Sequence, residues 1–126
     1  MLLPIDAKFP LEDYARLCEA RDKADKALET ESVKKLQQRI ELEAGKIADK
    51  YIEVPYTTNF AVLYLPVESL WAEVLAIPGL LETIQRKYRV TVAGPTVLAA
   101  LLNSLQMGFR TLAIERRSAE VWQLLS

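Results

Sequence analysis

Apolar and polar positions follow a period of two in some parts of the chain and of three to four in others, which predicts strands separated by helices. Residues 2–9 predict a short strand with apolar side chains on one face and Asp6 and Lys8 together on the other. Residues 11–31 and 32–51 predict two helices, the second with apolar positions three, four or seven residues apart.

The second half of the chain continues this alternation. Residues 59–66 are almost entirely apolar, which predicts a strand that is buried on both faces. Residues 67–87 predict a helix that Pro78-Gly79 divides into two pieces. Residues 90–93 predict a third short strand.

A long helix is expected from residue 97 onward, and if it persists to residue 125 its length is about 45 Å at 1.5 Å per residue. The resulting order, β-α-α-β-α-β-α, predicts an α/β fold with a three-stranded mixed sheet flanked by helices. The first two strands should be parallel neighbours joined by a right-handed crossover. So thin a sheet, with a strand beginning at residue 2, indicates part of a longer protein.

Composition adds limits on the class of site. The chain has 126 residues, 51% of them hydrophobic and 26% charged, as in one globular domain. It contains no histidine, which excludes Ser-His-Asp and Cys-His nucleophilic sites and histidine-bound zinc. A single cysteine and no predicted signal peptide or membrane span favour a cytoplasmic location. Any metal must then be a hard cation bound by oxygen ligands.

Charge is distributed unevenly, although the net charge is only −1. Residues 86–126 carry six basic and two acidic side chains, so a nucleic-acid surface would be local. Its candidate residues are Arg86, Lys87, Arg89, Arg110, Arg116 and Arg117. The alternative is that these are ordinary solvated positions on helix faces.

The Asp6-Ala7-Lys8 sequence is the one spacing that suggests chemistry. On a strand it places a carboxylate and an ammonium on one face, with Cβ atoms about 7 Å apart. A carboxylate can bind Mg²⁺, and a nearby lysine can orient or deprotonate a water or stabilise a phosphoryl transition state. The alternative is an exposed ion pair on an edge strand, worth about 0–1 kcal/mol.

Several separated motifs, in a fixed order, extend this observation over the whole chain. They are Ile5-Asp6-Ala7-Lys8-Phe9-Pro10-Leu11 followed by Tyr14, Lys50-Tyr51-Ile52, Thr57-Thr58-Asn59-Phe60, Leu65-Pro66-Val67-Glu68, Gly94-Pro95-Thr96 and Met107-Gly108-Phe109-Arg110-Thr111-Leu112. Together they resemble the RmuC family of DNA recombination proteins, over essentially all 126 residues. The family pattern usually has serine where Gly94 stands, so a helix N-cap hydroxyl is lost here.

The resemblance implies a restriction-endonuclease-like domain of the PD-(D/E)xK superfamily, in which carboxylates hold Mg²⁺ for phosphodiester cleavage. Asp6 would be the second metal-binding carboxylate and Lys8 the catalytic lysine. The first carboxylate has no counterpart and would lie on a strand before Met1. Residues 1–126 would therefore be a single partial nuclease-like domain, expected to be inactive by itself. The helix after the first strand flanks the site in such folds, which adds Lys34, Lys35 and Arg39 as candidate DNA contacts.

Three functions remain open at this point. The first is a Mg²⁺-dependent nuclease domain of a DNA-processing protein that acts in recombination. The second is a degenerate nuclease fold that binds DNA or a protein without cleaving, and the third is an α/β interaction domain whose long helices mediate assembly. DNA is the expected partner, with no membrane contact from this segment. Self-association is also expected, through the edge strand at residues 2–9 or through the long C-terminal helix.

Overall fold

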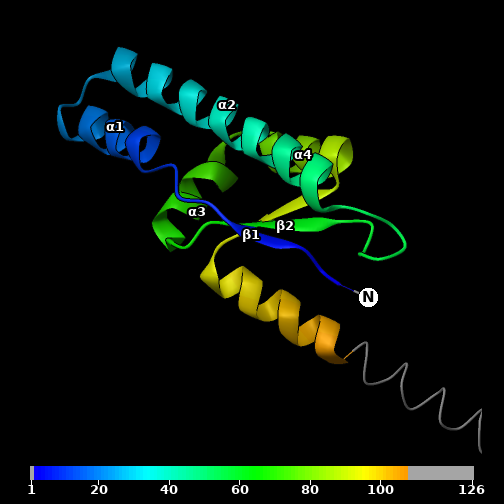
Figure 1. Cartoon of the computed structure of the whole chain (residues 1–126). Helices are drawn as coiled ribbons and strands as arrows, with labels where there is room; N and C mark the ends of the chain where they lie inside the picture. The colour runs from blue at the N-terminus through cyan, green and yellow to red at the C-terminus, as the bar shows by residue number, and fades with distance from the viewer. Residues whose placement is uncertain (1, 108–126) are drawn as a thin grey trace, which may run out of the picture. The chain divides into compact units, whose positions relative to one another are not determined.

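A computed structural model describes residues 2–107 and divides the chain into two units, residues 1–95 and 96–126. The described elements of the first unit are β1 (Ile5–Ala7), α1 (Leu11–Asp22), α2 (Lys26–Tyr51), β2 (Ala61–Tyr64), α3 (Glu68–Ala76), α4 (Leu80–Tyr88) and β3 (Val90–Ala93) (Figure 1). A further helix covers residues 95–107. The α/β class and the division at Pro78-Gly79 are confirmed, whereas the predicted continuation of the last helix to residue 125 lies outside the described residues.

The sheet is entirely parallel, with strand order β1-β2-β3. Asp6 is opposite Leu63 in one pair of strands, and Leu63 is opposite Val92 in the other. The prediction that the first two strands are parallel neighbours is therefore confirmed, and the prediction of a mixed sheet is wrong. Helices connect each strand to the next and return the chain to the same end of the sheet, which gives every strand the same direction.

The β2 strand is the centre of the core, as its apolar run predicts. Its residues Ala61, Val62 and Leu63 are completely buried. Helix α2 packs against β2 and β3, and α4 packs against β3 and α2 (Figure 1). Within residues 2–107, no helix combines the length and the hydrophobicity that crossing a lipid bilayer would require.

The β1 strand is shorter than the predicted strand over residues 2–9. Regular pairing covers Ile5–Ala7, and Leu2 forms only an isolated bridge with Thr57. The apolar side chains of the predicted strand are also more exposed than the alternation of apolar and polar residues suggests. Ile5 is 41% exposed and Phe9 is 45% exposed. Within the described chain β1 is an edge strand, so self-association through this edge remains a prediction.

The first two helices form a hairpin whose turn precedes the predicted boundary at residues 31 and 32. Helix α1 ends at Asp22 and α2 begins at Lys26. Between them Ala24 has a φ of 52°, and the Asp25 side chain accepts a hydrogen bond from the backbone N–H of Leu28 at 3.0 Å. Asp25 is therefore the N-cap of α2. The boundary was misplaced because alanine in a left-handed turn is no turn signal.

We expect Asp25→Ala to lower the free energy of unfolding by about 1 kcal/mol, because it removes this cap from the longest described helix of the first unit. Urea unfolding followed by circular dichroism measures the change. Asp25→Asn is the matched control, since asparagine caps as well as aspartate. If Asp25→Ala and Asp25→Asn lowered the free energy of unfolding equally, the carboxylate would stabilise the helix through its charge rather than through the capping hydrogen bond.

Candidate functional site

Asp6 of β1 and Lys8, which follows the last residue of β1 directly, lie on the same side of the chain, as the period of two predicts. The Lys8 Nζ is 3.3 Å from the Asp6 Oδ2. The backbone N–H of Lys8 donates to the Tyr64 carbonyl at 2.9 Å, so the residue is fixed to β2 just beyond the regular strand. In parallel α/β sheets, ligand sites form at the carboxyl ends of the strands.

Glu43 reaches the same ammonium from helix α2. Its Oε2 is 3.6 Å from the Lys8 Nζ, and its side chain is only 12% exposed. Ile40, Ala44 and Ile47 on the buried face of α2 set the rotation of the helix and direct Glu43 toward β1. Glu43 is not among the candidate residues that the sequence alone indicates.

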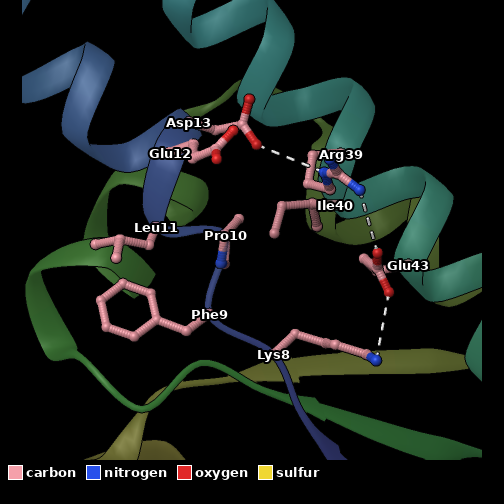
Figure 2. A pocket seen from close by; sticks show the side chains of 9 residues that line it. All are labelled: Lys8, Phe9, Pro10, Leu11, Glu12, Asp13, Arg39, Ile40 and Glu43. Carbon is pink, nitrogen blue, oxygen red and sulfur yellow. Dashed lines mark ion pairs between the residues drawn. The ribbon is translucent and has the colours of Figure 1, made fainter.

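Arg39 and Asp13 extend the cluster to helix α1. The Arg39 Nε is 3.5 Å from the Asp13 Oδ2, and its second contact, from Nη1, is 3.5 Å from the Glu43 Oε1. Figure 2 shows the line of ion pairs from Lys8 through Glu43 and Arg39 to Asp13. With Asp6, five charges of alternating sign therefore join β1, α2 and α1.

A cavity of about 430 Å³ opens beside these charges. One wall is the segment 8–13, which leads from β1 into α1, and the other is formed by Arg39, Ile40 and Glu43 of α2 (Figure 2). Its apolar border includes Phe9 and Leu11, which are 45% and 60% exposed. Lys8, Arg39 and Glu43 thus line a solvent-accessible hollow, whereas Asp6 is not among its lining residues.

The environment of Lys8 favours its charged form. A hydrogen bond from its ammonium to Asp6 and the negative charge of Asp6 raise the pKa of Lys8, with a smaller contribution from Glu43. Lys8 is therefore protonated at neutral pH in this arrangement. It can donate hydrogen bonds and stabilise negative charge, but it cannot act as a general base while both carboxylates hold it.

The carboxylates around Lys8 are suitable donors for a hard cation. Asp6 and Glu43 both approach the Lys8 ammonium, so one oxygen of each carboxylate already faces a positively charged group. Within residues 2–107, however, no three acidic or cysteine side chains gather closely enough to hold a metal ion. The donor type fits Mg²⁺, which keeps several waters and accepts as few as one or two protein carboxylates.

The predicted DNA-contacting residues have different surroundings. Arg39 lies in the cavity and is 47% exposed. Lys35 is exposed and pairs with Glu31 at 3.1 Å, and Lys34 is exposed on α2. Of the other candidates, Arg86, Lys87 and Arg89 are exposed at the end of α4 or directly after it, and Arg110, Arg116 and Arg117 lie outside the described residues.

Comparisons with known proteins match this chain to one family over nearly its whole length. Two relatives, each named DNA recombination protein RmuC homolog, come from Xylella fastidiosa strains Temecula1 and 9a5c. Each is 58% identical over 123 residues, which cover 98% of this chain and 27% of the relative. No solved structure matches. The family model for the RmuC family matches residues 1–126, and the chain therefore belongs to the RmuC family.

Proposed function

We propose that this chain is the part of a DNA-processing protein that carries a Mg²⁺-dependent phosphodiester-cleaving site, with Asp6 and Lys8 as its catalytic residues. The observation that carries the proposal is the placement of Asp6, Lys8 and Glu43 together at the carboxyl end of β1, beside an open cavity. The names of the Xylella fastidiosa relatives, which refer to DNA recombination, support DNA as the substrate class.

In this proposal each charged group has a separate task. Asp6 and Glu43 would hold Mg²⁺, which supplies Lewis-acid stabilisation of phosphate charge when it is bound. Lys8 would donate to an oxygen of the phosphate as negative charge develops there. The Lys8 contacts of 3.3 and 3.6 Å are longer than the best charge-assisted hydrogen bonds, so a phosphate oxygen can compete for the ammonium.

DNA would approach the cavity from the side of Arg39, and the acidic lining residues Glu12, Asp13 and Glu43 would oppose its phosphates. Arg39 is proposed to contact a phosphate there, and Lys34 and Lys35 on the same helix, with Arg110, Arg116 and Arg117, to contribute weaker backbone contacts. The carboxylates that pair with Arg39 and Lys35 reduce the local positive charge, which predicts modest affinity, and the salt dependence should scale with the number of phosphates that these side chains still neutralise.

A non-catalytic DNA-binding or protein-binding module is the second candidate. The alternating charges favour it in one respect, because Lys8 is neutralised by two carboxylates and no third ligand lies beside them within residues 2–107. Such a module would use the same cavity for binding and would not respond to Mg²⁺.

Nicking of supercoiled plasmid separates the two candidates. We expect a protein that carries this chain at the length of its relatives to nick the plasmid with Mg²⁺ or Mn²⁺ and to lose this activity in EDTA. The same assay on the 126-residue chain tests whether Asp6 and Glu43 suffice. Binding of the plasmid without cleavage at either length would support the non-catalytic module.

A further inference from the structure

Five basic side chains of residues 2–107 make ion pairs with acids, and the last two basic residues of α2 are among those that make none. Within residues 2–107, Lys8, Arg21, Lys23, Lys35 and Arg39 make ion pairs. Lys46 and Lys50, on the C-terminal half of α2, are exposed and make none in that part of the chain. Their charges are therefore available to an anionic partner.

The helical repeat places these two lysines in line with the candidate site. At about 100° per residue, Arg39, Lys46 and Lys50 all project within about 60° of Glu43 around the α2 axis. Glu43 itself faces Lys8 of β1. Lys46 and Lys50 therefore continue the side of α2 that borders the cavity, with Lys50 about 10 Å beyond Glu43 along the helix.

Two accessible aromatic rings follow Lys50 in the chain. Tyr51 is 37% exposed and Tyr56 is 71% exposed. The Lys50 Nζ is 5.2 Å from the centre of the Tyr51 ring. The backbone around Tyr56 is held by a hydrogen bond from the N–H of Leu2 to the Tyr56 carbonyl at 3.1 Å. Exposed rings on a fixed backbone, together with lysines that carry no ion pair within residues 2–107, are the usual components of a surface for unpaired bases, and of the two rings Tyr51 is the one in contact with such a lysine.

We propose that Lys46, Lys50, Tyr51 and Tyr56 form a binding track for single-stranded DNA, which follows α2 toward Asp6 and Lys8. The lysines bind successive phosphates, and the tyrosines stack against bases that only a single strand exposes. The destination of the track rests on the proposed cleavage site, but binding along it requires neither metal nor catalysis.

Fluorescence anisotropy with labelled oligothymidine in EDTA tests the lysines without cleavage. In Lys46→Gln/Lys50→Gln we expect about 10-fold weaker binding at low salt and a log–log salt slope that is smaller by about 1.4, or about 0.7 for each phosphate that the variant no longer neutralises. Arg16→Gln/Lys26→Gln is the matched control, because both residues are exposed and make no ion pair within residues 2–107 and lie in or near the α1–α2 hairpin. Equal slopes in the two double variants would overturn the proposal.

Tyr56 decides between a single strand and a duplex. Tyr56→Ala should weaken oligothymidine binding by about 5-fold or more, whereas Tyr56→Phe, which retains the ring, should bind like the wild type. Duplex of the same length should bind more weakly than the single strand and should not respond to Tyr56→Ala. Tighter binding of the duplex with no effect of Tyr56→Ala would overturn the single-strand track. Since all measurements are made in EDTA, failure of Mg²⁺-dependent cleavage would leave these results unchanged.

Discussion

Asp6→Ala and Lys8→Ala are each expected to lower Mg²⁺-dependent cleavage by about 100-fold or more, in a protein that carries the chain at the length of its relatives. Asp6 would bind the metal, and Lys8 would stabilise charge that is greatest in the transition state. Both groups therefore act on the reaction more than on DNA binding. The measurement is plasmid nicking under single-turnover conditions, with DNA affinity measured separately by anisotropy.

Glu43 provides a sharper test of the same arrangement. Glu43→Gln retains size and hydrogen bonding but removes a charge that faces both Lys8 and Arg39. We expect an intermediate loss of cleavage with nearly unchanged DNA affinity. Asp22→Ala, at the exposed end of α1, is the control for an acidic side chain outside the cluster. Wild-type cleavage in both Asp6→Ala and Lys8→Ala would show that the two residues form only a surface ion pair.

The part of the site that is local in sequence was predictable, and the part that depends on packing was not. Asp6 and Lys8 share a face because side chains on any strand alternate, whatever the strand packs against. Glu43 is 35 positions after Lys8, and only the packing of α2 over the sheet brings the two within 3.6 Å. An acidic residue four positions after Arg39 was visible in the sequence, but this spacing is common on solvated helices.

The same distinction explains the errors in the fold. The buried run of β2 specified a central strand, and the helices between strands would have sufficed to predict a parallel sheet. The boundary between α1 and α2 was predicted at the wrong residues for a different reason. Ala24 is strained in its left-handed conformation, and the cap at Asp25 marks the start of α2 better than residues 30–32 do.

Gly94→Ser is expected to destabilise the chain by about 1–3 kcal/mol. A Cβ on residue 94 would lie 2.9 Å from the Trp71 Cβ and 3.0 Å from the Trp71 Cγ. These atoms are next to the backbone of α3 and cannot move as freely as the end of a long side chain. The indole N–H of Trp71 also donates to the Val92 carbonyl at 3.4 Å, which further limits its movement.

A serine before the helix at residues 95–107 would also gain an N-cap hydroxyl, but replacing glycine with a capping residue contributes only a few tenths of a kcal/mol. The steric cost should therefore exceed the capping gain. Gly94→Ala separates the two, since it introduces the same Cβ without the hydroxyl, and it should be slightly less stable than Gly94→Ser in urea unfolding. Gly79→Ala is the matched control for backbone strain alone, because Gly79 has a φ of 72° and no atom within 4 Å of the added Cβ. A Gly94→Ser variant more stable than the wild type would show that Trp71 repacks easily and that capping controls this position.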